Sequence, residues 1–111
     1  VGGWKVTGLN NGVGGLESSA ATQAFVLIFT EDQLTARGDC NLLTANYSTT
    51  GEEPLTFSPV SSTKKACEGE AAEADEWMTA ALGRTTDYEV VGGTLTLRAA
   101  DGAMQVTATR G

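Results

Sequence analysis

Histidine is absent from the 111-residue chain, and this absence removes most familiar catalytic arrangements. Histidine is the usual general base at neutral pH, the usual partner of a serine or cysteine nucleophile and the commonest zinc ligand. Basic residues are also few: seven lysines and arginines against fourteen aspartates and glutamates leave a net charge of −7. This charge repels phosphate backbones and anionic membrane surfaces, so we expect no nucleic-acid binding.

The chain also lacks a long apolar run. No segment approaches the ~20 residues of a membrane-spanning helix, and no signal peptide is visible at Val1. The length suits one domain, which buries roughly two thirds of its unfolded surface and sustains a core without a metal. We therefore expect a single domain over residues 1–111, with no membrane span and no cofactor.

Cysteine occurs twice, at positions 40 and 67. Two cysteines in a small acidic chain suit a disulfide in an oxidising, extracytoplasmic compartment, and a Cys40–Cys67 bridge would tie a mid-chain hairpin to the start of a helix. The alternative is two reduced thiols that pack as small apolar side chains. A redox-active pair is a further alternative, because Lys64 and Lys65 closely precede Cys67. The chain is thus either cytoplasmic or has lost a leader, and the cysteines favour the second interpretation.

Apolar periodicity predicts a series of strands in the first half of the chain. Residues 4–6 alternate and predict a short first strand, and the glycine- and serine-rich segment 10–20 predicts a surface loop that buries almost nothing. The apolar run 24–30 predicts the central strand of the sheet, covered on both faces. Residues 33–37 and 41–48 continue the meander, followed by a strand marked by Leu55, Phe57 and Val60.

The period changes after Glu68, where spacings of three and four residues predict one apolar helical face. That face comprises Ala74, Trp77, Met78, Ala81 and Leu82. We expect this helix to be the only one, to end in a left-handed cap at Gly83 and to place Arg84 near the negative end of its dipole. Residues 86–91, 94–98 and 104–109 then predict three strands joined by hairpin turns at 92–93 and 101–102.

These elements, without βαβ alternation, predict an α+β fold. We expect a curved antiparallel sheet that forms a partly open β-barrel of about eight short strands, with one α-helix packed against it.

Several residues follow one another in a characteristic order: Gly38-Asp39-Cys40-Asn41, Tyr47, Thr63-Lys64-Lys65-Ala66-Cys67, Ala81-Leu82 and Leu95-Thr96-Leu97. This order resembles the META domain, the family of heat shock protein HslJ, over residues 4 to about 107. The family pattern is Gly-Cys-Asn, three residues, Gly, one residue and Tyr, with Thr-x-x-Ala-Cys later. The chain departs from it at Asp39 and Ala45, where the pattern has glycine, so we expect the local turn geometry after Gly38 to differ from that of the family.

The resemblance implies a partly open antiparallel barrel with a helix at its mouth, similar to the pilot lipoproteins of secretins, and a pairing of Cys40 with Cys67. It also implies a secreted, periplasmic or lipid-anchored bacterial protein, from a family linked to envelope stress, motility and virulence. No enzymatic activity is attached to the family. The resemblance therefore says more about fold than about function.

Five carboxylates crowd the segment 68–76: Glu68, Glu70, Glu73, Asp75 and Glu76. Calcium is one interpretation, but the spacing fits no EF-hand loop. We favour a solvated helix start, where acidic residues suit the positive end of the dipole. A hydrolase that uses two carboxylates without histidine is a weaker hypothesis. We thus predict no catalytic residues and no metal, and we expect Asn41 to hydrogen-bond the backbone of its turn.

An apolar mouth between helix and barrel is the candidate binding site, for an acyl chain or a partner's peptide. The residues expected near it are Trp4, Phe25, Phe57, Trp77 and Met78, although the interpretation we favour for these five is that they fill the core. We expect a monomeric, non-catalytic accessory or interaction module of the bacterial cell envelope, with an unknown envelope protein as its partner. The alternative is a carrier of a small hydrophobic ligand or lipid.

Overall fold

The computed structural model describes residues 2–13, 15–63 and 66–110. These residues form two helices, α1 (Ala20–Gln23) and α2 (Gly69–Arg84). The strands are β1 (Gly2–Asn10), β2 (Leu16–Glu17), β3 (Val26–Phe29), β4 (Gln33–Arg37), β5 (Leu42–Ser48), β6 (Thr56–Phe57), β7 (Ser61–Ser62), β8 (Thr85–Val91), β9 (Thr94–Ala99) and β10 (Met104–Arg110). Neither helix combines the length and the hydropathy that crossing a membrane requires, as far as the described residues go.

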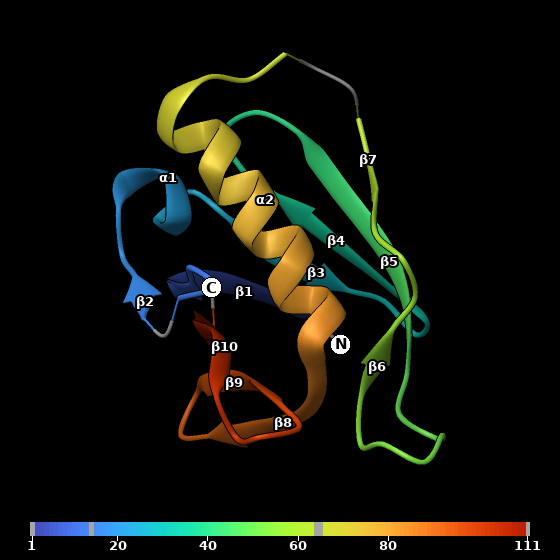
Figure 1. Cartoon of the computed structure of the whole chain (residues 1–111). Helices are drawn as coiled ribbons and strands as arrows, with labels where there is room; N and C mark the ends of the chain where they lie inside the picture. The colour runs from blue at the N-terminus through green and yellow to red at the C-terminus, as the bar shows by residue number, and fades with distance from the viewer. Residues whose placement is uncertain (1, 14, 64–65, 111) are drawn as a thin grey trace.

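The strands form one curved antiparallel sheet in the order β6-β5-β4-β3-β1-β10-β9-β8, with β2 added to β1 and β7 to β5. The sheet curls until its two end strands approach each other (Figure 1). At that seam the backbone N–H of Leu55 donates to the carbonyl of Thr86 at 3.2 Å. The predicted fold class, a partly open barrel of about eight strands with one helix packed against it, is confirmed.

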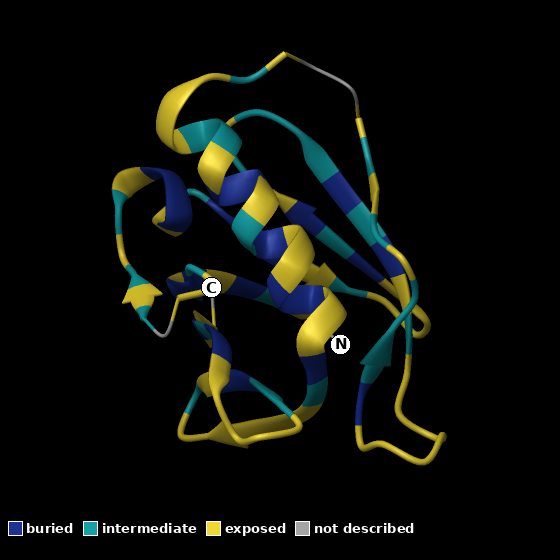
Figure 2. Cartoon of the chain, viewed as in Figure 1, coloured by how far each residue is buried: buried dark blue, intermediate teal, exposed yellow. Residues whose placement is uncertain are grey.

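Helix α2 crosses the open side of the sheet and packs against β1, β10 and β6 (Figure 1). Its buried apolar residues are Ala74, Met78, Ala81 and Leu82, as the helical spacing predicts, while Trp77 is partly buried. Figure 2 shows this as alternating buried and exposed segments along the helix. The side chains of the helix and the inner faces of the strands together form one core.

The C-terminal hairpins also follow the prediction. Gly92 and Gly93 join β8 to β9 with φ of +57° and +85°, values that favour glycine and suit the tight turn. The next turn carries Gly102 at φ +87°, and the carboxylate of Asp101 accepts the N–H of Ala103 at 2.9 Å. The sheet edge formed by β8 is therefore well specified by local sequence.

The N-terminal segment differs from the prediction in two ways. Strand β1 covers nine residues instead of three, because it pairs with β3, β10 and β2 in turn along its length. Residues 10–20 are not all exposed loop: Asn10 is buried, β2 lies within the segment, and Ser19 caps the short helix α1 by accepting the N–H of Thr22. The expectation of a single helix is thus wrong, because the four-residue helix α1 is also present.

Strand β3 lies in the middle of the sheet, as predicted, but only one of its faces is covered. Leu27 is fully buried, whereas Ile28, on the opposite face, is 39% exposed. The reason is that α2 covers only the concave side of the curved sheet. The expectation that this strand is covered on both faces is wrong.

Two boundaries in the second half also need correction. The strand expected around residues 55–60 is instead two short strands, β6 and β7, separated by Pro59, which has no N–H for pairing. Gly83 lies inside α2 and has no positive φ, so it is not a left-handed cap. The helix continues to Arg84, in its last turn as predicted, and the hydroxyl of Thr85 then donates to the carbonyl of Ala81 at 2.8 Å.

Candidate functional site

An open pocket of about 240 Å³ lies among the strands of the curled sheet, and we call it the mouth pocket. No residue of α2 lines it, so this pocket is not the predicted mouth between helix and barrel. Its inner wall consists of the buried residues Trp4, Leu55, Leu95 and Leu97. Its remaining lining residues are Phe29, Glu31, Tyr47, Thr49, Tyr88 and Val90. These ten residues come from β1, β3, β5, β8, β9 and the segments that connect strands. Because β5 and β8 lie near opposite ends of the sheet order, they meet at one pocket only where the sheet curls.

Strands β8 and β9 build one side of the mouth pocket. Tyr88 lies opposite Leu97, and Val90 lies opposite Leu95 in the antiparallel register. Directly paired residues point to the same face of a sheet, so all four side chains face inward. The two leucines are buried, but Tyr88 is 44% and Val90 47% exposed. The rim of the pocket therefore presents apolar surface to solvent.

An aromatic group holds the opposite side. The rings of Phe29 and Tyr47 meet edge to face with centroids 5.4 Å apart, and those of Tyr47 and Phe57 are 6.3 Å apart. The hydroxyl of Tyr47 donates to the carbonyl of Thr30, which fixes the ring against the turn between β3 and β4. The ring contacts and this hydrogen bond therefore hold the aromatic side of the pocket in place without a bound partner.

The charges around the mouth pocket are mostly negative. Glu31 is the charged residue in its lining. The turns and the strand that frame it carry further carboxylates: Asp32, Glu52, Glu53, Asp87 and Glu89. Two guanidinium groups oppose them: that of Arg98 lies 3.3 Å from the Glu89 carboxylate, and that of Arg110 lies 5.0 Å from the centroid of the Trp4 ring.

Of the five residues predicted near a binding mouth, the structure places only Trp4 in the lining of this pocket. Phe25 and Met78 are buried in the core, while Phe57 and Trp77 are partly buried against it. Tyr88 and Val90 line the pocket although they were not predicted from the sequence. Their signal was the alternation in the strand before the Gly-Gly turn, which shows that they share a face but not that this face borders a pocket.

A second cluster surrounds the disulfide between Cys40 and Cys67, whose Cα atoms are 6.2 Å apart. The bridge connects the segment between β4 and β5 to the segment before α2, as the sequence position of the cysteines predicts. Lys64 and Lys65, invoked for a redox role, lie outside the described residues.

Asn41 links this disulfide to α2. Its side-chain amide donates to the buried carboxylate of Asp75 at 3.0 Å, and its oxygen accepts the hydroxyl of Thr63 at 2.9 Å. Thr63 Oγ1 in turn accepts the N–H of Leu42 at 3.0 Å. Asn41 was expected to hydrogen-bond the backbone of its turn, and these contacts show that its side chain also bonds the side chains of distant segments.

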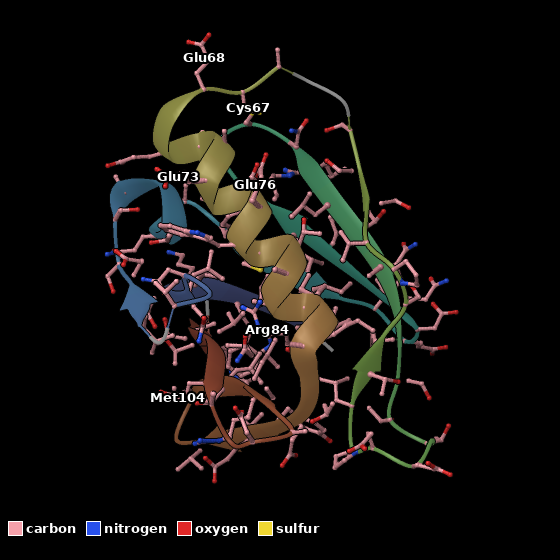
Figure 3. The ribbon with its side chains drawn as sticks, in the orientation of Figure 1. Cys67, Glu68, Glu73, Glu76, Arg84 and Met104 are labelled. Carbon is pink, nitrogen blue, oxygen red and sulfur yellow. A yellow bond between two sulfur atoms is a disulfide. The ribbon has the colours of Figure 1, made fainter. Side chains whose placement is uncertain are left out.

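The ligand atoms of Cys40, Cys67 and Asp75 lie within 4.8 Å of one another. Thiolates are the cysteine form that binds metals, and in the disulfide neither sulfur is a thiolate. Of the five acidic residues in the segment before and along α2, Asp75 alone belongs to such a group within the described part of the chain. Asp75 is buried, so the prediction that all five carboxylates are solvated is wrong for this residue. Figure 3 shows Glu68, Glu73 and Glu76 separated along this segment. Their arrangement fits a solvated helix surface.

The fold and the two clusters together define a small, disulfide-linked, partly open antiparallel barrel with an apolar pocket at its mouth. The META domain family matches residues 2–110, and the chain belongs to this family. The residues it shares with the family pattern lie at the disulfide cluster and, through Tyr47, at one wall of the mouth pocket.

Two solved structures are similar in fold. An NMR structure of a protein from Burkholderia xenovorans superposes with a TM-score of 0.75 at 17% identity, over 99% of this chain and 81% of that chain. A crystal structure of a DUF4847 family protein from Bacteroides vulgatus gives a TM-score of 0.66 at 12% identity, over 99% and 92%. No curated protein matches the chain significantly.

Proposed function

We propose that this META domain is a non-catalytic interaction module of the bacterial cell envelope, with the mouth pocket as its binding site. The observation that carries this proposal is the exposed apolar rim, Tyr88 and Val90, above a pocket whose inner wall is buried and apolar. Exposed apolar surface beside a concave pocket is typical of a site that another molecule covers.

The polar groups of the pocket support binding rather than catalysis. The lining contains one carboxylate, that of Glu31, and no histidine occurs in the chain. Glycoside hydrolysis, the reaction that carboxylates perform without histidine, needs two carboxyl groups on either side of the bond that breaks. A pocket with a single carboxylate at its rim can orient a partner but lacks that pair.

The Cys40–Cys67 disulfide supports placement of the module outside the cytoplasm, since disulfides persist in oxidising compartments. Secretion, an anchored form and a part in envelope stress are the remaining elements of this proposal. Each of these fits a small binding domain with a disulfide, because a disulfide forms and persists in an oxidising compartment.

A carrier of a small hydrophobic ligand is the second candidate, supported by the same pocket. Its volume of about 240 Å³ lies below the roughly 300–1,000 Å³ usual for small-molecule sites. This favours one or two side chains of a partner over a lipid. Native mass spectrometry of protein purified without detergent separates the two, because a carrier retains a lipid-sized adduct and an interaction module does not.

Site-specific photocrosslinking in cells of the source organism tests the main proposal. A benzophenone amino acid replaces Tyr88 at the pocket rim in one variant and Val13 in the other, which is 86% exposed and does not line the pocket. We expect discrete crosslinked protein bands from position 88 only. Identical band patterns from both positions, or none from position 88, contradict the proposal.

A further inference from the structure

Strand β8 is an edge of the sheet, and most of this edge is open. In the described chain β8 pairs along its length with β9 alone. The bond from Leu55 N to Thr86 O reaches it from the other end of the barrel, but only at the beginning of the strand. Strand β6, which ends the sheet on the other side, is two residues long and closes no more of the seam (Figure 1).

The register shows which backbone groups face the opening. Val91 and Thr94 flank the two-residue turn and form the first hydrogen-bonded pair of the hairpin. Hydrogen-bonded and open positions alternate along a strand, so the N–H and C=O groups of Tyr88 and Val90 point away from β9. The side chains of these same two residues line the mouth pocket.

An edge strand alone is no site, because proteins protect such edges with charged residues. The carboxylate of Asp87 does so here by accepting the N–H of Tyr88 at 2.7 Å. Protection does not explain the apolar side chains on this edge: Tyr88, Val90 and Val91 are all exposed, and β8 is mostly exposed in Figure 2. The N–H of Val90 and the carbonyls of Tyr88 and Val90 still face the open edge, at the residues that line the apolar pocket, whereas a partner strand would compete with Asp87 for the N–H of Tyr88.

We propose that an extended peptide segment of a partner protein pairs with β8 as an added strand and inserts an apolar side chain into the mouth pocket. This inference rests on the proposed binding function and names the partner's chemistry. Alternate open N–H and C=O groups match an extended backbone, and a pocket beneath them selects alternate side chains. The pocket volume suits side chains rather than a whole helix.

Charge defines the partner further. Six carboxylates lie in the lining of the mouth pocket and in the segments that frame it. Two guanidinium groups oppose them: that of Arg98, which pairs with one of the six, Glu89, and that of Arg110, which lies over the Trp4 ring. A segment with basic residues beside its apolar ones complements this rim. A second copy of β8 brings Asp87 and Glu89 against the same carboxylates, so like charges oppose self-pairing.

The test uses the full chain, isotope-labelled for NMR, and a blocked peptide with the sequence Lys-Val-Lys-Leu-Lys-Val-Lys. We expect the amide signals of Tyr88 and Val90 to shift on titration, and the affinity to fall as salt screens the carboxylates. The same peptide with glutamate in place of lysine binds about tenfold more weakly or not at all. Equal affinity for the acidic peptide overturns the assignment of a basic partner.

Two matched variants test whether the peptide binds in the mouth pocket or elsewhere on the surface of β8. Val90 faces the pocket and Val91, its neighbour, points to the opposite face of β8. Val90→Ala is expected to weaken binding several-fold, whereas Val91→Ala leaves it unchanged. Equal effects of the two substitutions contradict insertion into the mouth pocket.

Backbone pairing has its own test. Val90→Pro removes an N–H that faces the open edge, a position where proline is tolerated, and is expected to weaken binding about tenfold or more. N-methylation of one alternate set of peptide residues, either Val and Leu or Lys, removes the corresponding donors without any change in the protein. We expect at least one of the two methylated peptides to lose binding, and this readout holds even where Val90→Pro perturbs the fold.

The outcomes distinguish this inference from the proposed function. Binding that survives Val90→Pro and both methylated peptides but is weakened by Val90→Ala overturns strand addition and leaves pocket binding intact. An absence of shifts at the mouth pocket with every peptide overturns the inference, while the crosslinking at position 88 still decides the function. A doubled mass in sedimentation, abolished by Val90→Pro, assigns the edge to a second copy and overturns a foreign partner.

Discussion

Gly38 approaches the aromatic ring of Phe25 so closely that no larger residue fits. A Cβ atom at position 38 lies 2.7 Å from Phe25 Cε1, and Phe25 itself is fully buried. Gly38→Ala is therefore expected to lower the free energy of unfolding by about 1–3 kcal/mol through overpacking. Urea denaturation measures the change.

Gly51 supplies the matched control, because a Cβ there has no neighbour within 4 Å and its φ is not in the left-handed region. Gly51→Ala is expected to change the free energy of unfolding by less than about 0.5 kcal/mol. Equal destabilisation by the two substitutions contradicts the packing argument.

Asn41 is the second residue whose role depends on particular contacts. Asn41→Ala leaves the buried carboxylate of Asp75 without this donor and is expected to cost about 1–3 kcal/mol of unfolding free energy. The matched variant is Asn46→Ala on the exposed side of β5, which should change stability by less than about 0.5 kcal/mol. Thermal unfolding followed by circular dichroism compares them, and a larger effect at position 46 contradicts the assignment.

At the scale of elements, α2 closes the open side of the barrel through its buried stripe. Met78 is fully buried at the centre of that stripe, so Met78→Ala is expected to cost about 2–5 kcal/mol through lost burial and a cavity. Thr79→Ala, at the exposed neighbour, should stay within about 0.5 kcal/mol. Urea denaturation of both variants tests this, and a small effect at Met78 means that the helix packs more loosely than described.

At the scale of the whole molecule, the disulfide closes the loop between positions 40 and 67. On the chain-entropy estimate, the double variant Cys40→Ser and Cys67→Ser loses about 3.5 kcal/mol of unfolding free energy. Denaturation with and without reductant measures it: reductant should lower the midpoint of the natural chain and leave that of the double variant unchanged. Identical midpoints for the oxidised chain and the double variant contradict a stabilising role.

Prediction succeeded where local pattern and tertiary environment agree. The α2 stripe, the alternation of β4 and β5, and the glycine turns each carry their own periodic or conformational signal. It failed where a neighbour decides the structure. Strand β1 contains glycines with low strand propensity but is held by three partners. Helix α2 runs past Gly83 to Arg84 and is capped by Thr85, which donates its N–H to the carbonyl of Leu82 and its hydroxyl to the carbonyl of Ala81.

The candidate site was less predictable than the fold. Phe25 and Met78 were candidates for the mouth but fill the core, which is the role favoured from the sequence because a domain of this size has few other residues to do so. Tyr88 and Val90 line the pocket instead, together with residues from β1, β3 and β5. The periodicity of a single segment cannot predict contacts between segments that lie so far apart in the chain.

Periodicity, composition and motif order are local properties, and they were enough to predict the antiparallel class, the position of the long helix, the acidic surface and the family. The curl of the sheet, the edge that stays open and the side chains that meet at the mouth pocket become apparent only in the folded chain. These depend on the length of β6, the placement of α2 and the pairing of β1 with β10. They arise from contacts between distant segments, and so they exist only in the folded chain.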